Sequence, residues 1–281
     1  GMTTNQVFKT VEELARSELN LEEKIQKLPL LIISKDTNIR DSIGMHFQKK
    51  GYSRVITAKN TQETVLQVNK KGLSEMLRFS VSDLDIGEKY FLKEDFQNLP
   101  GLEAEAFWKN CMEEKIMTII GEVGIPLSYD DFIRKIKKFG TVDDQLADNM
   151  NEIQKKAKPF DTKHLLDLLH ERNVLSEVKS FYILKETADP HFQKLQEQLL
   201  KENGELTIKP PFSAESICEK ITHALKELIS KLQNATLLDT LSKFDLPLTK
   251  AQKEALMTSF QAVNALIDKR AESIAEKYEE K

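Results

Sequence analysis

The sequence predicts an α/β fold in which a five-stranded parallel sheet is interrupted by a helical insertion and followed by a C-terminal helical extension. Short apolar segments alternate with amphipathic helical segments over residues 28–88, and the same alternation returns over residues 178–232. Between these stretches, residues 89–177 carry only helical patterns. Strands that alternate with helices form parallel βαβ units with right-handed crossovers. We therefore expect one sheet whose strands come from two separate stretches of the chain.

The composition is that of a helix-rich globular protein. The 281 residues include 41 Lys and Arg against 45 Asp and Glu, so the net charge is −4. Nucleic-acid binding relies on clustered basic residues, and since no half of the chain is basic we expect no nucleic-acid partner. The longest apolar run, residues 28–33, is too short to cross a bilayer, so we expect no membrane partner. Cys111 and Cys218 lie far apart in sequence, which predicts two reduced thiols in a cytoplasmic protein.

The first stretch opens with an N-terminal helix over residues 1–27, whose apolar side chains recur with a helical period. Residues 30–33 form a short apolar run, which is typical of a strand buried on both faces. A helix with apolar residues spaced by four follows, and Gly51 closes it.

Two more strands complete this stretch. Residues 53–58 predict the second strand, and a helix capped by Asn60 or Thr61 follows it. Residues 76–82 predict the third strand, which runs directly into the turn Asp83-Leu84-Asp85-Ile86-Gly87. Open α/β sheets bind ligands at the carboxyl ends of their strands, so this turn is a candidate site.

The middle of the chain, residues 89–177, predicts a helical domain inserted into the sheet. The helical patterns cover residues 102–120, 128–139, 141–157 and 161–172. The breaks between them fall at Gly121, Gly124-Ile125-Pro126, Gly140 and Pro159.

Strand patterns return at residues 179–184 and 205–208, with a helix over residues 189–203 between them. Ser213 begins a further helix. The extension, residues 233–281, ends in a helix that carries one apolar stripe. This stripe predicts packing on the body of the protein or on a second copy of the chain.

The order of these pieces resembles the receiver domain of bacterial response regulators. The residues that carry the likeness are, in chain order, Leu31-Ile32-Ile33, Ser34-Lys35-Asp36, Ile39-Arg40, Gly51-Tyr52, Val55-Ile56-Thr57-Ala58, the turn from Asp83 to Gly87, the strand from Ser180 to Leu184, and Lys209-Pro210. The resemblance implies a receiver-like (flavodoxin-like) sheet, split by the insertion.

The resemblance also implies roles for residues at the carboxyl edge of that sheet. Asp83 matches the phosphoacceptor, and Lys209 matches the lysine that pairs with it. Ser34 and Lys35 stand where a receiver keeps the acids that hold a divalent ion, and Asp36 is the acid beside them.

The position of the hydroxyl that binds the phosphoryl group falls at Lys185, with Thr187 two residues further on. An ammonium group in place of a metal-binding carboxylate removes a ligand and repels the cation. Lys35 could instead pair with Asp83 and keep it ionised without a metal. The likeness therefore implies a degenerate receiver without phosphotransfer, in which Asp83 and Lys209 form a structural ion pair and no cofactor is needed. A small-ligand or anion site near Ser34, Asp83 and Lys209 also stays open.

Two other interpretations of the same turn stay open. In one, Asp83 is phosphorylated, and Asp36 and Asp85 hold Mg²⁺ as the cofactor. In the other, Asp83-Leu84-Asp85 resembles the nucleophile loop of haloacid-dehalogenase-like phosphatases. The residues after Asp85 depart from that family, and its second acidic pair would be Asp130-Asp131 or Asp143-Asp144, which stand at expected helix starts.

An alternative organisation treats residues 181–229 as a second copy of the opening units, with Lys158-Pro159 as a rival Lys-Pro pair. We prefer one split sheet, because three strands alone make a poor open sheet. The sequence thus predicts a non-catalytic regulatory protein. Its pseudo-receiver domain would bind a protein partner, or a second copy of the chain, through the helical insertion or the C-terminal helix.

Overall fold

The computed structural model describes residues 26–27, 29–70, 79–113, 124–175, 178–224 and 227. The chain divides into two compact units. One consists of Gly1–Leu28, Ser42–Val55 and Ser213–Lys281, and the other of Pro29–Asp41 and Ile56–Phe212. The expected N-terminal helix, apart from residues 26–27, and the C-terminal extension lie outside the described residues.

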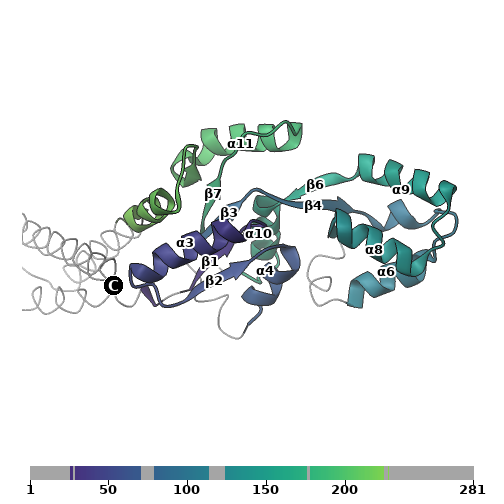
Figure 1. Ribbon diagram of the computed structural model, residues 1–281, viewed down its shortest axis with the longest axis horizontal. Coiled ribbons are helices and arrows are strands. Elements are labelled where there is room, and N and C mark those ends of the chain that lie inside the picture. Colours follow the sequence, from purple (N-terminus) through teal and green to yellow (C-terminus); the bar gives the residue numbers. More distant parts are fainter. Residues whose placement is uncertain are drawn as a thin grey trace, which may run out of the picture. The chain divides into compact units, whose positions relative to one another are not determined.

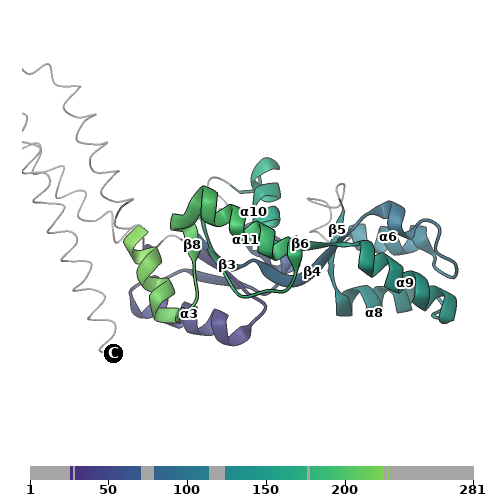
Figure 2. The same cartoon turned by 90° about the horizontal axis from the view of Figure 1, so that it is seen from above.

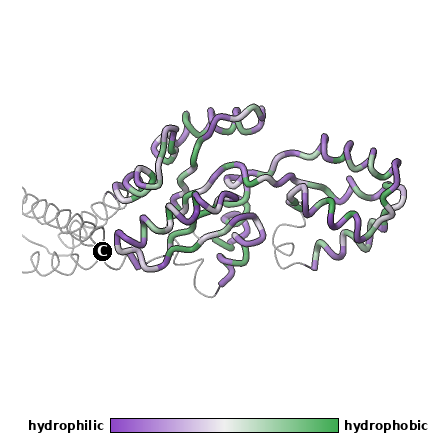
Figure 3. The backbone as a smooth tube through the Cα atoms, in the orientation of Figure 1, coloured by the Kyte–Doolittle hydropathy of each residue, from purple (hydrophilic) through white to green (hydrophobic). Residues whose placement is uncertain are grey.

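The predicted α/β fold with one five-stranded parallel sheet is confirmed (Figure 1). Its strands are β1 (Leu30–Ile33), β2 (Val55–Ala58), β3 (Phe79–Asp83), β7 (Lys179–Ile183) and β8 (Thr207–Ile208). Their order across the sheet is β2-β1-β3-β7-β8, consistent with a flavodoxin-like fold. The strands are mostly hydrophobic, whereas the helices alternate between hydrophilic and hydrophobic residues (Figure 3).

The two stretches of chain meet at the centre of this sheet. Strand β3, the last before the insertion, pairs with β1 on one side and with β7 on the other. Asp83 is the register partner of Ile183 in β7. The strands therefore form one split sheet, and the alternative of two separate partial repeats is not supported.

Helices connect the strands, and polar residues cap them. The sequence predicted three of these connections, whereas it placed the helix over residues 161–172 in the insertion. These helices are α3 (Thr37–Lys49), α4 (Thr61–Val68), α10 (Thr162–Glu171) and α11 (Pro190–Asn203). The Asn60 side chain accepts a hydrogen bond from the backbone N–H of Glu63 and so caps α4. Asp161 and Asp189 cap α10 and α11 in the same way.

The inserted segment is not purely helical, contrary to the prediction. Residues 85–161, called the inserted lobe below, contain a three-stranded antiparallel sheet of order β5-β4-β6 (Figure 2). Its strands are β4 (Asp85–Phe91), β5 (Ile125–Ser128) and β6 (Lys158–Asp161). Its helices are η1 (Lys93–Phe96, a 3₁₀ turn), α6 (Ala104–Glu113), α8 (Tyr129–Phe139) and α9 (Asp144–Lys156).

Two of these strands contain proline, which in the sequence alone indicates the end of a helix. Pro126 lies in β5 and Pro159 in β6. Proline lacks the N–H that a central strand needs, but an edge strand tolerates it. Both β5 and β6 are edge strands, since β4 lies between them. The Pro-containing segments that we interpreted as helix boundaries are therefore edge strands.

Aromatic side chains fill the interior of the inserted lobe, as part of a hydrophobic core that also includes residues of the parallel sheet. Phe91 and Phe132 stack with ring centroids 4.8 Å apart, and Phe96 and Phe107 lie 4.7 Å apart. All four are fully buried, and Trp108 packs against Phe96. The phenylalanine and tryptophan side chains of this lobe thus stabilise it from within.

Cys111 and Cys218 are not disulfide-bonded, and both are buried. Burial raises the pKa of Cys218 to about 12, so this thiol stays protonated at neutral pH. Among the helices that the structure describes, none combines the length and the apolar character that a membrane span requires.

Candidate functional site

The candidate site lies at the carboxyl ends of three adjacent strands of the parallel sheet. Ser34 follows β1, Asp83 ends β3, and Lys185 follows β7. Parallel strands bring their carboxyl ends to one edge, and β3 lies between β1 and β7. These three residues therefore converge although 151 positions separate the first from the last.

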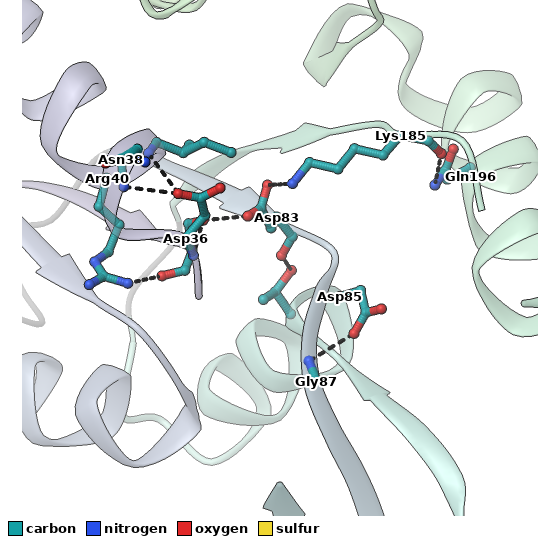
Figure 4. A network of polar contacts seen from close by, with 11 residues as sticks. Asp36, Asn38, Arg40, Asp83, Asp85, Gly87, Lys185 and Gln196 are labelled. Atoms are coloured by element: carbon teal, nitrogen blue, oxygen red, sulfur yellow. Dashed lines mark hydrogen bonds and ion pairs between the residues drawn. The ribbon is translucent and has the colours of Figure 1, made fainter. Parts of the chain in front are cut away.

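Asp83 is held from both sides (Figure 4). Only 2% of its surface is exposed. The Ser34 hydroxyl donates a hydrogen bond to Asp83 Oδ2, and the Lys185 ammonium lies 3.1 Å from Asp83 Oδ1. A buried carboxylate is costly unless a cation or hydrogen-bond donors compensate it. Ser34 and Lys185 supply that compensation.

Lys185 is the cation on Asp83 Oδ1. Among the described residues, Oδ1 accepts no hydrogen bond, so the ion pair with Lys185 is its polar contact. The Lys185 side chain is 43% exposed, so its stem crosses from solvent to the buried carboxylate. Compensation of Oδ1 therefore depends on one half-exposed side chain.

Lys209 does not form the predicted ion pair with Asp83. It lies directly after β8, and its side chain is exposed. Strand β8 pairs with β7 and not with β3, so its end lies one strand further from Asp83. Lys185 follows the strand next to Asp83 and takes the partner role that we assigned to Lys209.

Lys35 lies at the mouth of the site without an ion pair to Asp83. Its ammonium passes over the turn at Gly87, where an added Cβ would lie 3.7 Å from Lys35 Nζ. Lys35, Asp83, Asp85 and Lys185 line a common hollow of about 120 Å³. Lys35 therefore lines the same hollow as the carboxylate, with its ammonium near Gly87.

The acids beside Asp83 are engaged with backbone groups. Asp36 Oδ1 accepts hydrogen bonds from the N–H groups of Asn38 and Ile39, at 2.9 and 3.3 Å, at the start of α3. Asp85 Oδ1 accepts a hydrogen bond from the N–H of Gly87 at 2.8 Å. These contacts are local turns and caps, which Asp forms for conformational reasons alone.

The residues around Asp83 do not fit a bound Mg²⁺. This ion needs several oxygen ligands, usually including carboxylates, around it. Here Ser34 has no charge, and the Lys185 ammonium already contacts the carboxylate. Within the described part of the chain, no three His, Cys, Asp or Glu side chains gather as a metal-binding group.

Thr187 serves the backbone of its own loop. Its hydroxyl accepts a hydrogen bond from the N–H of Asp189 at 3.2 Å, and Thr187 lines the same hollow as Lys185. Two α11 side chains hold this loop: Gln193 Nε2 donates to the carbonyl of Thr187 at 2.8 Å, and Gln196 Nε2 to the carbonyl of Lys185 at 3.0 Å. The sequence did not indicate these glutamines, because an amide on a helix surface has many roles.

Glu88 is a buried acid that the sequence analysis missed. It lies in β4, and it accepts hydrogen bonds from the hydroxyl and the N–H of Thr61 at the start of α4. Burial raises the pKa of Glu88 from 4.5 to about 7, against the opposing effect of the Thr61 bonds, and Asp131 adds to the rise. Alternation within residues 85–91 could have revealed it as an inward-facing acid.

The acidic pairs of the phosphatase alternative are helix caps in the inserted lobe. Asp130 and Asp131 occupy the first turn of α8, and Asp143 caps α9 by accepting from the N–H of Leu146. Acids at these positions are stabilised by the helix dipole. Lys158-Pro159 belongs to β6, outside the parallel sheet, so it is not a rival end of the fifth strand.

Comparisons with known proteins add no relative to this description. No protein-family model, no curated protein and no solved structure matches the chain significantly.

Proposed function

We propose that this chain is a non-catalytic regulatory protein built on a receiver-like domain that does not transfer phosphate. One observation carries the proposal: the Lys185 ammonium lies 3.1 Å from the buried Asp83 Oδ1. The resemblance places Asp83 at the phosphoacceptor and Lys185 at the phosphoryl-binding hydroxyl. A cation therefore occupies the place that the phosphoryl group would take.

The positive charge next to Asp83 and the engagement of its carboxylate oxygens both argue against phosphotransfer at this residue. A carboxylate that attacks phosphorus needs a free oxygen and a divalent ion to offset the phosphoryl charge. Both Asp83 oxygens have partners, Ser34 and Lys185. Lys35 lines the same hollow and adds positive charge to it. Ser34 and Lys185 compensate the buried carboxylate without a metal.

The regulatory role requires a partner, and we place it on a protein or on a second copy of the chain. The net charge of −4 and the even spread of basic residues favour a protein partner over nucleic acid. The inserted lobe and residues 233–281 are the additions to the receiver-like sheet, so they are our candidates for the binding surface. We place the protein in the cytoplasm, because its two cysteines are not joined in a disulfide.

Intact mass spectrometry tests the loss of phosphotransfer. The full chain is incubated with Mg²⁺ and acetyl phosphate, and we expect no phosphoryl adduct. An adduct that disappears in Asp83→Ala would overturn the proposal and restore the working acceptor. Release of phosphate that depends on both Asp83 and Asp85 would instead support the phosphatase alternative.

Light scattering and pulldown with the full chain test the interaction role. We expect either a dimer or a complex with a protein that depends on residues 85–161 or 233–281. A monomer that retains no protein would count against a regulatory function.

A further inference from the structure

The inserted lobe returns to the parallel sheet at Asp161, a residue that is 4% exposed. Asp161 Oδ1 accepts a hydrogen bond from the N–H of His164 at 2.7 Å and so caps α10. Asp161 Oδ2 lies 2.9 Å from Nε2 of His191, in the first turn of α11. The exit of the inserted lobe is therefore bonded to α11 through a buried carboxylate.

Thr162, the next residue, bonds the same exit to the end of β3. Its hydroxyl donates to the carbonyl of Asp83 at 2.8 Å, and its N–H donates to the carbonyl of Leu84 at 3.1 Å. The inserted lobe thus leaves and rejoins the sheet at one place, at the backbone of Asp83 and Leu84.

Helix α11 reaches the same carboxylate by a second route. Gln196 Nε2 holds the carbonyl of Lys185 at 3.0 Å, and the Lys185 ammonium contacts Asp83 Oδ1 (Figure 4). Gln193 holds the neighbouring carbonyl of Thr187. One rigid helix therefore contacts both the loop that carries Lys185 and the last residue of the inserted lobe.

We propose that α11 couples the inserted lobe to the Asp83–Lys185 pair. A displacement of the lobe would then alter the Asp83–Lys185 contact, and breaking that contact would alter the attachment of the lobe. The contacts form a closed polar circuit through Asp83, Lys185, Gln196, His191, Asp161 and Thr162. The biological meaning of this coupling rests on the proposed regulatory function. A partner bound to the inserted lobe would act on the sheet edge without any phosphotransfer.

The circuit favours two discrete arrangements over a gradual shift. Displacing α11 would draw His191 from Asp161 and Lys185 from Asp83, and each carboxylate is almost fully buried. A buried carboxylate that loses its partner lowers the stability of the fold several times more than an exposed carboxylate that loses its partner. The two contacts are therefore expected to hold together or to break together.

A double-mutant cycle between Lys185→Met and His191→Ala tests the coupling. The two residues have no hydrogen bond or ion pair with each other among the described contacts, and distant, independent sites have additive effects. Each single variant is expected to raise the equilibrium constant of unfolding by a certain factor. In urea unfolding of the full chain, we expect the factor for the double variant to be about threefold smaller than the product of the two single factors. Additive losses would overturn the proposal.

Lys155→Met serves as the matched control for this cycle. Lys155 lies on α9, where its ammonium is 3.7 Å from Glu152, outside the circuit. Its effect should add to that of Lys185→Met. A coupling as large as the one for His191 would show a general effect on stability and would also overturn the proposal.

Hydrogen exchange of the single variants gives a second readout if the double variant does not fold. In Lys185→Met, we expect amides of residues 194–200 and 158–161 to exchange about tenfold faster, with little change in α8. Unchanged exchange in residues 158–161 would contradict the coupling. A phosphoryl adduct on Asp83 would overturn the proposed function and leave both of these readouts intact.

Discussion

At the scale of single residues, Lys185 compensates the buried carboxylate of Asp83. The ammonium comes from the strand adjacent to β3, and its stem remains 43% exposed. Removing one partner of a buried pair leaves the other charge uncompensated, which costs more than the pair itself contributes. Lys185 is therefore expected to matter for stability, and Lys209 is not.

We expect Lys185→Met to lower the free energy of unfolding by about 1–2 kcal/mol, between the values for exposed and fully buried pairs. Lys209→Met is the matched control, and its effect should stay within about 0.5 kcal/mol. Urea unfolding at neutral pH measures both. A larger loss for Lys209→Met than for Lys185→Met would reverse our assignment of the cation.

The pH dependence of the free energy of unfolding should reflect the ionisation of Glu88. Burial raises its pKa from 4.5 to about 7, so the folded state keeps a proton that the unfolded chain has already released. Stability is then lost as the pH rises from about 4.5 through about 7, by up to roughly 3 kcal/mol for a shift of this size.

Glu88→Gln should remove that loss, because the amide does not titrate. Urea unfolding at pH 5 and pH 8 compares the two proteins, with Glu105→Gln on an exposed part of α6 as the control. If wild type and Glu88→Gln changed in parallel between these pH values, the assignment of the buried acid would fail.

At the scale of elements, the parallel strands could be predicted and those of the inserted lobe could not. Strand β1 is a run of four buried apolar residues, and such a run between helical patterns indicates a central strand. Strands β5 and β6 are four residues each and contain proline, which is compatible with a strand only at an edge. Whether a segment is an edge strand depends on its neighbours in space, and local sequence does not contain that information.

The candidate site could also be predicted only in part. The convergence of Ser34, Asp83 and the residues after β7 follows from strand order. The choice of Lys185 over Lys209 as the partner of Asp83 depends on which strand lies next to β3, together with the reach of a half-exposed side chain. The bond from Asp161 to His191 joins two elements whose contact no spacing predicts.

Two glycines give a matched test of the packing of the inserted lobe. A Cβ on Gly124 would lie 2.5 Å from the ring of Tyr90 and 2.9 Å from the carbonyl of Phe91, whereas one on Gly204 would meet nothing within 4 Å. We expect Gly124→Ala to cost about 1–3 kcal/mol, because β5 or Tyr90 must move. Gly204→Ala should be neutral or stabilising by up to about 1 kcal/mol, since its backbone is in the right-handed helical region. Equal effects in thermal unfolding would show that the Tyr90 ring does not lie against Gly124.

At the scale of the whole molecule, one sheet is assembled from two stretches of chain that a folded lobe separates. The lobe has its own antiparallel sheet, and it joins the parallel sheet beside Asp83. Its buried aromatic side chains belong to the same hydrophobic core as residues of the parallel sheet. An insertion at this edge places its two ends next to the candidate site.

Magnesium-dependent thermal stability tests this account most directly. A ligand that binds only the folded state raises the melting temperature. We expect Mg²⁺ to leave the melting temperature of the wild-type chain unchanged. It should raise that of the triple variant Ser34→Asp, Lys35→Asp, Lys185→Thr, which restores the acids and the hydroxyl around Asp83. A rise in the wild-type protein that is lost in Asp83→Asn would contradict the account.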